Sequence, residues 1–404
     1  MTMRLTDSDR QRLVCLTNIP TPYRLHLFRV MSGELADRGW DFEAWFMAHS
    51  EPGRYWSFNP DDFGFRHRIL SGCTVVLKGI AIHTNPCVIG MLARRPADVL
   101  LVGGSLFQPT SILAATTALW IKRSATLFWT ESHLKAVTHK NKVAVTAKRL
   151  LLAPYPAFVV PGEWAADYVR AYAPGRPIFT LPNGVDERLF GDTVQANRAQ
   201  RDAIRMAWKI PGDRRMLLLP ARLAPEKNII PFVMALSQLD SAITQRFVLF
   251  IAGDGPLRNE VATLLESARH LQVRMLGHVS ETDMLLLYTA ADGFVLPSVR
   301  DRNPLSVIEA LWAGLPLLLS DCVGNQHEAL VPTENGWLFD PKSWEEIRLA
   351  VEKWCTADSS ELEIRGQMSK RIAQERFDTK SVVRSFLDQV LPATKLTRGT
   401  DALS

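Results

Sequence analysis

The sequence predicts an α/β protein made of two doubly wound, Rossmann-like parallel-sheet domains that face each other across a cleft. One observation is the size of the chain, because 404 residues with 47% hydrophobic composition exceed what a single core usually organises. The other is a repeated pattern in which a short apolar run is followed by a turn and a longer helical segment. That pattern is typical of parallel strands covered by helices on both faces.

The apolar runs are found in both halves of the chain. Those of the first half are RLVCLTNI, FEAWFMA, ADVLLVGG, SATLFWT, PAFVVP and PIFTLP. The second half continues with MLLLPARL, RFVLFIAGDG, VRMLGHV, GFVLPSV and LPLLLSDC. Ligands bind at the carboxyl ends of such strands, so the cleft between two such domains is the expected site.

A domain boundary is expected at the turn-forming residues PNGVD, which follow the sixth run. We therefore assign residues 1–181 to an N-terminal, acceptor-binding domain and 182–375 to a C-terminal, donor-binding domain, with a linker before the strand at Met216. A final amphipathic helix is expected over 376–391, crossing back to the N-terminal domain. Residues 392–404 are expected to form a frayed tail.

Cysteine usage and hydropathy limit the class of protein. The five cysteines are scattered and form no C-x-x-C pair, which argues against a disulfide framework and against a thiolate metal site. The N-terminus lacks the pattern of a signal peptide, and no apolar stretch approaches 18 residues. These features predict a cytoplasmic protein whose contact with a membrane, if any, is peripheral.

The positive charge is concentrated in the N-terminal half. Residues 1–181 carry 21 Lys and Arg against 13 Asp and Glu, whereas residues 182–404 carry 26 against 29. Part of the excess lies in the segment 135–149, KAVTHKNKVAVTAKR. Two interpretations stay open: a basic, partly amphipathic helix on an anionic membrane surface or acceptor, and a solvated helix face. Nucleic acid is not an expected partner, because no stacking aromatic pattern or binding module accompanies these charges.

The loop APEKN follows the strand-like run MLLLPARL and places Arg222 and Lys227 five residues apart. Two cations at a strand end suit a diphosphate, because they neutralise the charge that develops on a nucleoside diphosphate leaving group. The alternative is a surface ion pair with Glu226.

The next run ends in Gly253-Asp254-Gly255-Pro256 and passes directly into a predicted helix. Glycines permit close approach of a ligand to the backbone, and a helix N-terminus attracts negative charge. Many strand-to-helix turns need glycine only in order to turn, so this motif alone is weak.

The segment SVRDRNPLSVIEALWAGLP is the most specific feature of the sequence. Asp301 and Glu309 lie eight residues apart, with Asn303 and Pro304 opening the helix that carries Glu309. Backbone amides from Leu305 onward would be available to a phosphate or sugar oxygen. A carboxylate at 309 suits two ribose hydroxyls, and in an apolar helix it is costly unless it has a partner.

The ordered motifs ARLAPEKN, IAGDGP, LGHV, ADGFVLPS, D-x7-E, EALWAGLP and NGWLFDP resemble the C-terminal domain of the family 4 retaining glycosyltransferases of GT-B architecture, a branch of the glycosyl transferases group 1. NIPTPYR, VGGS, VVPGEWAADYV and PNGVD resemble the N-terminal domain more loosely. The resemblance spans roughly residues 13–391.

The resemblance implies that Arg222 and Lys227 bind the donor diphosphate and assist catalysis, and that Glu309 binds the ribose. Asp301 stands where the family has the first glutamate of its E-x7-E pattern, which touches the transferred sugar, so this chain departs from the family there. The full implied donor-binding set is Arg222, Lys227, Gly253, Gly255, His278, Val279, Asp301, Asn303, Pro304, Leu305 and Glu309.

In the N-terminal domain the resemblance implies a histidine that approaches the donor sugar, and His133 is the candidate catalytic residue. Glu131 lies beside it, and Thr21 and Arg24 follow the first strand on the acceptor side. The alternatives are a satisfied polar residue for His133 and an ion pair at a helix start for Arg24.

The predicted activity is retaining transfer of a sugar from a nucleoside diphosphate sugar to an acceptor hydroxyl, without a metal or other cofactor. No D-x-D metal signature stands in a suitable loop, and Asp61-Asp62 is an isolated pair. The expected acceptor is a glycan, in the form of a lipid-linked oligosaccharide of cell-surface polysaccharide biosynthesis. The alternatives are a non-hydrolysing sugar-nucleotide epimerase and an inactive nucleotide-sugar-binding subunit.

Overall fold

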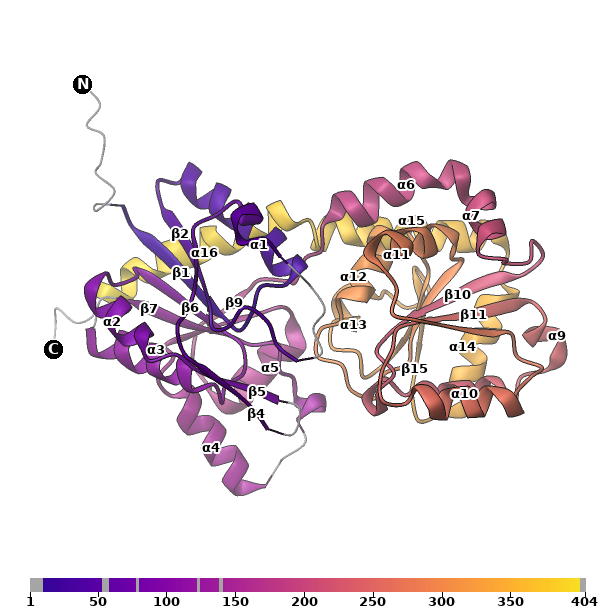
Figure 1. Cartoon of the computed structure of the whole chain (residues 1–404), viewed down its shortest axis with the longest axis horizontal. Helices are drawn as coiled ribbons and strands as arrows, with labels where there is room; N and C mark the ends of the chain where they lie inside the picture. The colour runs from indigo at the N-terminus through magenta and orange to yellow at the C-terminus, as the bar shows by residue number, and fades with distance from the viewer. Residues whose placement is uncertain (1–9, 53–57, 78–79, 122–123, 138–140, 400–404) are drawn as a thin grey trace. The chain divides into compact units, whose positions relative to one another are not determined.

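The computed structural model describes residues 10–52, 58–77, 80–121, 124–137 and 141–399, with side chains described up to residue 393. It divides into two compact units, and each contains a parallel sheet between layers of helices (Figure 1). Unit 1 combines the chain up to Asn183 with the segment from Thr379 onward, and unit 2 comprises Gly184–Asp378.

Unit 1 is built on a seven-stranded sheet in the order β3-β2-β1-β6-β7-β8-β9, and all its pairings are parallel. The strands are β1 (Arg12–Thr17), β2 (Asp41–Phe46), β3 (His67–Ile69), β6 (Val99–Gly103), β7 (Ala125–Trp129), β8 (Ala157–Val160) and β9 (Ile178–Thr180). Every apolar run predicted as a strand in the first half forms one. The strand β3 at the edge of the sheet was not predicted.

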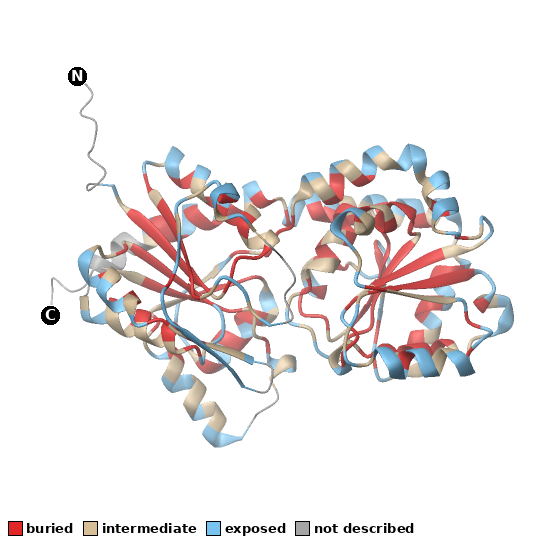
Figure 2. Ribbon diagram, viewed as in Figure 1, coloured by how far each residue is buried: buried red, intermediate tan, exposed pale blue. Residues whose placement is uncertain are grey.

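Helices cover both faces of this sheet because its strands are apolar on both sides. Along β1, Leu13 and Cys15 belong to one buried cluster, whereas Val14 and Leu16 belong to another. The first cluster packs beneath α1 (Pro22–Asp37) and α16 (Thr379–Gly399), and the second beneath α2 (Cys87–Arg94), α3 (Pro109–Ile121) and α5 (Glu163–Tyr172). The central strands β1, β2, β6, β7 and β8 are accordingly the most deeply buried part of the unit (Figure 2).

A two-stranded antiparallel hairpin lies outside the main sheet of unit 1. It consists of β4 (Cys73–Leu77) and β5 (Ile80–Thr84), which pair only with each other. Strand β5 is fixed by Gln108, whose amide nitrogen donates to the carbonyl oxygen of Ala81 at 2.8 Å. The outer part of the hairpin exposes apolar side chains, since Leu77 is 57% exposed and Ile80 is 64% exposed.

The basic segment 135–149 does not form one continuous helix. Lys135 lies in a short 3-10 turn, η2 (Leu134–Ala136), and the helix α4 runs from Lys142 to Leu152. A new helix begins there because the side-chain oxygen of Asn141 accepts a hydrogen bond from the backbone N–H of Ala144 at 2.8 Å. Residues 138–140, including the basic Lys140, lie outside the described residues.

Unit 2 is built on a six-stranded parallel sheet in the order β12-β11-β10-β13-β14-β15. Its strands are β10 (Arg215–Pro220), β11 (Phe247–Ala252), β12 (Val273–Gly277), β13 (Gly293–Leu296), β14 (Leu317–Ser320) and β15 (Gly336–Phe339). The five runs predicted in the second half again form strands. The additional edge strand, β15, lies within the motif NGWLFDP, in which no strand was predicted.

Helices surround the second sheet. They are α8 (Ile229–Leu236), α9 (Ser241–Thr244), α10 (Arg258–Ser267), α11 (Glu281–Ala290), α12 (Leu305–Trp312), α13 (Gln326–Ala329), α14 (Trp344–Thr356) and α15 (Ser359–Arg376). The segment expected to be a linker is also helical: a π-helical stretch (Arg188–Thr193) and α6 (Val194–Asn197) precede α7 (Arg201–Ala207). Phe190 and Val194 of this segment belong to the buried core of unit 2.

The last helix is longer than predicted. Helix α15 ends at Arg376, and α16 begins at Thr379 and continues past Pro392 to Gly399. Val383, Phe386 and Leu387 of α16 join the core of unit 1, which explains why the chain returns there. Among the described residues, no helix combines the length and the apolar character needed to cross a bilayer.

Candidate donor site

The loops that hold the predicted donor-binding residues lie at one edge of the second sheet. Strand β10 is flanked by β11 on one side and by β13 on the other, so the strand order reverses between β10 and β13. In open parallel sheets the crevice outside the carboxyl ends of the strands at such a point is the preferred place for a ligand. The segments carrying Arg222 and Lys227, after β10, and Asp301, after β13, meet there.

The loops after β10 and β13 are joined by side-chain and backbone contacts. The ammonium of Lys227 donates a hydrogen bond to Asp301, and both side chains are largely buried. The carbonyl oxygen of Glu226 accepts a hydrogen bond from the backbone N–H of Val299 at 3.0 Å. Lys227 therefore pairs with Asp301 and not with Glu226, which was the alternative partner considered from the sequence.

Arg222 differs from Lys227 in its surroundings. It is exposed, and within the described part of the chain its guanidinium makes no ion pair. A cation that is exposed beside the strand ends is available to an anionic group without first losing another partner. The two basic residues of the loop are therefore not equivalent.

The glycines after β11 allow this loop to approach the one after β10. Gly253 has φ +150°, and a Cβ atom there would lie 2.1 Å from the carbonyl oxygen of Ala221. A Cβ atom on Gly255 would lie 2.4 Å from the carbonyl oxygen of Leu223. Both positions require glycine because backbone segments pack closely there. This agrees with the alternative considered from the sequence, in which the glycines are needed for the turn, and contact with a ligand stays a prediction.

Glu309 is half-buried on α12, one turn from the start of the helix. The hydroxyl of Tyr288 on α11 donates to its Oε2 atom at 2.7 Å. Burial of the carboxyl raises the pKa of Glu309 to about 7, with the Tyr288 hydrogen bond opposing the rise and the charge of Glu281 adding to it. Burial of the tyrosine hydroxyl, together with the negative charge of Glu309, raises the pKa of Tyr288 well above its usual value.

The start of α12 is fixed from the neighbouring loop. Pro304 is the residue before the first helical turn, and its carbonyl oxygen accepts a hydrogen bond from the Asn325 side chain at 3.0 Å. Asn303 precedes it, and Leu305 opens the helix. His278, which is exposed, and Val279, which is half-buried, follow Gly277 at the end of β12. All these predicted donor-side residues belong to unit 2.

In unit 1 the structure brings together Arg24 and Glu131, two residues predicted for the acceptor side. The guanidinium of Arg24 donates to Glu131 Oε1 at 3.0 Å, and the Cζ atom of Arg24 lies 3.6 Å from the centroid of the Trp129 ring. Asn183 donates to the same oxygen at 2.9 Å. The partner of Arg24 thus comes from the end of strand β7, far away in the sequence. The alternative considered from the sequence was an ion pair at the start of the helix that carries Arg24.

His133 and Thr21 are buried in unit 1. His133 is 1% exposed, and its ring lies 5.2 Å from the ring of Trp164. Thr21 precedes the first turn of α1, where its carbonyl oxygen accepts a hydrogen bond from the backbone N–H of Leu25 at 2.9 Å. Both positions are set by packing within the unit.

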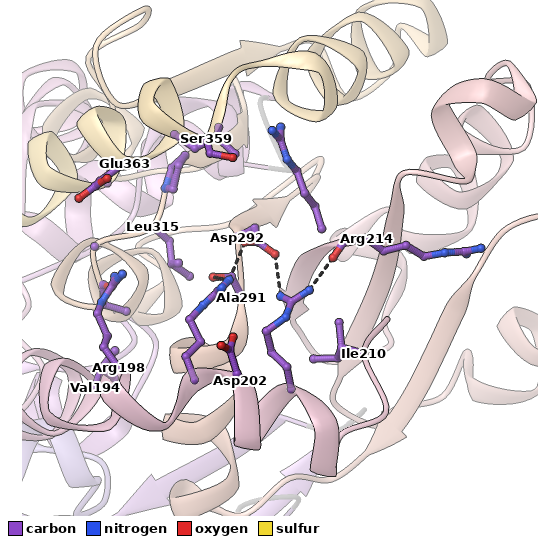
Figure 3. Close-up of a pocket in the computed structure, with 18 of the residues that line it drawn as sticks. Val194, Arg198, Asp202, Ile210, Arg214, Ala291, Asp292, Leu315, Ser359 and Glu363 are labelled. Atoms are coloured by element: carbon purple, nitrogen blue, oxygen red, sulfur yellow. Dashed lines mark hydrogen bonds and ion pairs between the residues drawn. The ribbon is translucent and has the colours of Figure 1, made fainter. Parts of the chain in front are cut away.

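A cavity of 1120 Å³ lies at the opposite edge of the second sheet, where β10, β13 and β14 begin (Figure 3). Near its centre Asp292 accepts hydrogen bonds from Arg201 at 2.6 Å and from Arg205 at 2.9 Å. It also accepts one from the backbone N–H of Met216 at 2.7 Å. This network fastens helix α7 to the sheet, and the cavity is separate from the carboxyl-end loops that carry the predicted donor residues.

The second unit also carries the similarity to known proteins. The profile of the family "Glycosyl transferases group 1" matches residues 200–374. Residues 200–374 therefore resemble a group 1 glycosyltransferase domain. The chain is 30% identical over 174 residues to the Escherichia coli UDP-Gal:alpha-D-GlcNAc-diphosphoundecaprenol alpha-1,3-galactosyltransferase, covering 42% of this chain and 43% of that protein. It is 30% identical over 141 residues to the alpha-monoglucosyldiacylglycerol synthase of Acholeplasma laidlawii, covering 34% and 35% of the two chains.

Solved glycosyltransferase structures share the fold of this chain over nearly its whole length. The matches to curated relatives span only about half of those relatives or less. Sucrose-phosphate synthase from Thermosynechococcus elongatus matches with a TM-score of 0.69 and 17% identity, covering 98% of this chain and 100% of that one. Anabaena Alr3699/HepE in complex with UDP and glucose matches with a TM-score of 0.70 and 14% identity, covering 95% and 100%. The GT-B fold class predicted from the sequence is confirmed.

Sequence reasoning missed two sets of residues. One contacts a predicted site residue in unit 2, and the other lies at the strand ends of the sheet in unit 1. Tyr288, the partner of Glu309, stands in an apolar helical run where an aromatic side chain indicates only a core position. At the corresponding edge of unit 1, Asn18, Glu51 and His83 form a hydrogen-bonded cluster. These three come from separate segments and form no local motif.

Proposed function

We propose that this protein transfers a glycosyl group from a nucleoside diphosphate sugar to a hydroxyl of an acceptor glycan, with retention of anomeric configuration. The observation that carries the proposal is the meeting of the Lys227 and Asp301 loops at the strand-order reversal of a domain that resembles the group 1 glycosyltransferases. Anabaena Alr3699/HepE, one of the structural neighbours, has also been solved in complex with UDP-glucose, which supports a nucleotide-sugar donor.

In the proposed reaction the bond between the anomeric carbon and the diphosphate oxygen breaks, and a bond from that carbon to the acceptor oxygen forms on the same face. The acceptor proton passes to the departing diphosphate, so the products are a nucleoside diphosphate and the extended glycan. Arg222 and Lys227 would stabilise the charge that develops on the leaving group, and this role requires no metal. Glu309 would hold the ribose, and Asp301 the transferred sugar.

The proposal is tested by a donor screen on the purified full chain. UDP-, GDP- and dTDP-sugars are each incubated with a short-chain alkyl diphosphate-linked N-acetylglucosamine, with and without EDTA, and nucleotide release and product mass are measured. We expect acceptor-dependent release with one donor, unchanged by EDTA, and an NMR coupling in the product that matches the donor anomer. Conversion of a donor to its epimer without acceptor would identify an isomerase, and absence of turnover with every donor would indicate a binding subunit.

A lipid-linked acceptor is the second part of the proposal. The names of two relatives specify a diphosphoundecaprenol-linked sugar and a diacylglycerol glycolipid. In this chain, exposed large apolar side chains are most numerous on unit 1, including Trp120 at 89%, Val143 at 79%, Ile80 at 64% and Leu77 at 57% exposed. Together with the basic charge of residues 1–181, they suit an anionic membrane surface at which such an acceptor is found.

Charge introduced into the β4–β5 hairpin is expected to weaken membrane binding. Ile80→Glu should lower the fraction of protein that sediments with anionic vesicles by about tenfold, because a side chain that enters the interface is replaced by a charged one. Ile364→Glu in unit 2 is the matched control, since Ile364 is likewise 64% exposed. Equal sedimentation of the two variants, or no binding of the unmodified protein at low salt, would remove the membrane from the proposal.

A further inference from the structure

The cluster in unit 1 lies at a place in the sheet that corresponds to the donor site in unit 2. Strand β1 has β2 on one side and β6 on the other, so the strand order of the first sheet reverses between β1 and β6. Asn18 directly follows β1, and Gly104 directly follows β6. The carboxyl ends of strands at such a reversal form the crevice where parallel sheets bind ligands.

Gly104 allows the Asn18 side chain to enter the space between these two strand ends. Its φ of +100° lies in the region that favours glycine, and a Cβ atom there would lie 2.3 Å from the Asn18 Oδ1 atom. Any other residue at 104 would displace the amide. The orientation of Asn18 is therefore built into the backbone at the strand-order reversal.

Asn18 and His83 both hold one oxygen of Glu51. The Asn18 amide nitrogen donates to Glu51 Oε1 at 3.1 Å, and His83 Nε2 lies 2.9 Å from the same oxygen. Because an ionised carboxylate only accepts, His83 carries its proton on Nε2. The Thr74 hydroxyl lies 2.9 Å from His83 Nδ1 and fixes the other side of the ring, which is fully buried.

The second oxygen of Glu51 differs from the first. The Glu51 side chain keeps 18% of its surface exposed, and its Oε2 atom accepts no hydrogen bond from the described residues. A carboxylate oxygen fixed through its partner oxygen, and still reachable from solvent, is open to a donor from outside the protein. Hydroxyl groups of a saccharide are donors of this kind, and hydrogen bonds to a charged acceptor are among the stronger ones.

We propose that Glu51 binds a hydroxyl group of the acceptor saccharide through Oε2, and that Asn18, His83 and Thr74 are positioning residues for this carboxylate. This inference rests on the proposed glycosyl transfer and assigns the acceptor site within unit 1. It adds to the pair Arg24 and Glu131, whose charges already satisfy each other. The carboxylate of Glu51, in contrast, keeps one oxygen for a ligand.

The decisive variant is Glu51→Gln. The amide oxygen of glutamine can keep the hydrogen bonds from Asn18 and His83, whereas its NH2 group replaces the free oxygen and cannot accept from a hydroxyl. We expect the KM for the alkyl diphosphate-linked N-acetylglucosamine to rise about 10- to 100-fold, with kcat, the donor KM and the melting temperature unchanged. Glu163→Gln, an exposed position on α5 that pairs with Arg170, is the control.

A positioning role is tested with Thr74→Val, an exposed position where loss of the hydroxyl does not endanger folding. It should raise the acceptor KM severalfold and leave the donor KM unchanged. Binding is also followed directly, by saturation-transfer NMR from the protein to the same alkyl-linked saccharide in the presence of UDP. Loss of saccharide signals in Glu51→Gln, with UDP signals retained, is the expected result.

The failures of the two proposals are distinguishable. If no donor is turned over but saccharide signals depend on Glu51, the transfer reaction is wrong and the saccharide site stands. An unchanged acceptor KM and unchanged saccharide signals in Glu51→Gln overturn the site. A lowered melting temperature with an equal loss of donor and acceptor binding would show that the cluster only ties the hairpin to the sheet, and Glu51-dependent binding of Mn²⁺ or Ca²⁺ would assign it to a cation.

Discussion

Replacing Arg222 by methionine is expected to lower kcat/KM for the donor about 100- to 1000-fold, because one preorganised cation is lost where the diphosphate leaves. Its melting temperature should stay that of the unmodified protein, since Arg222 is exposed and holds no ion pair within the described residues. Arg246→Met is the matched control: Arg246 is also exposed in unit 2, but it lines the cavity at the opposite edge of the sheet.

Lys227→Met should cause a comparable loss of activity and a second effect that Arg222→Met does not have. Asp301 is only 13% exposed in its side chain and would lose the cation that balances its charge. A largely buried carboxylate that loses a cationic partner is destabilised, so the melting temperature should fall.

The double variant Lys227→Met/Asp301→Asn separates the two effects of Lys227. Removing the carboxylate charge of Asp301 should restore the melting temperature, while activity stays low because the cation at the diphosphate is still missing. Full activity in Arg222→Met, or recovery of activity in the double variant, would contradict the diphosphate role. Initial rates of nucleotide release and thermal unfolding monitored by circular dichroism provide both measurements.

The parallel strands were predictable because each of them is apolar on both faces, as Leu13 to Leu16 illustrate by alternating between two cores. The β4–β5 hairpin does not follow that rule. Its strands pair only with each other and expose apolar residues such as Val75 and Ile80, so neither burial nor alternation distinguishes them in the sequence. The break in the basic segment depends on a capping hydrogen bond from Asn141, a local detail that charge counting does not detect.

The candidate site was predictable where it depends on short motifs. Arg222 and Lys227 stand on one loop, whereas Asp301 lies on the loop after β13 and Glu309 on the helix α12 that follows it. Contacts across the fold were not predictable in the same way, because Tyr288 reaches Glu309 from another helix. The same holds for Glu51, which follows β2 at a distance of five residues and meets a histidine from the hairpin.

The affinity for UDP is expected to depend on pH through Glu309. Its carboxyl has a pKa of about 7 because it is buried, and ribose hydroxyls donate to the ionised form. UDP should therefore bind more tightly as the pH rises from 6 to 8. Glu309→Gln should bind UDP about 10- to 100-fold more weakly at pH 8, with the difference shrinking at pH 6, where the carboxyl is mostly protonated. Titration calorimetry at several pH values measures both effects.

Stability should change in the opposite direction. The folded-state pKa of Glu309 lies above its ordinary value of 4.5, so between these two values the folded state holds a proton that the unfolded state has released. The stabilisation from this proton is present below about pH 4.5 and is lost as the pH rises through 7. Glu309→Gln should therefore exceed the unmodified protein in free energy of unfolding at pH 8, by on the order of 2 kcal/mol.

Tyr288→Phe tests whether the pH dependence belongs to Glu309. The Tyr288 hydroxyl stabilises the ionised carboxylate, so its removal should raise the pKa of Glu309 further and move the midpoint of the UDP affinity curve to higher pH. At pH well above that midpoint the variant should approach the affinity of the unmodified protein, whereas Glu309→Gln should stay weak at every pH. A midpoint that does not move in Tyr288→Phe would assign the titration to another group. If the midpoint does move, the same carboxylate lowers the stability of the folded protein at high pH and binds the donor there.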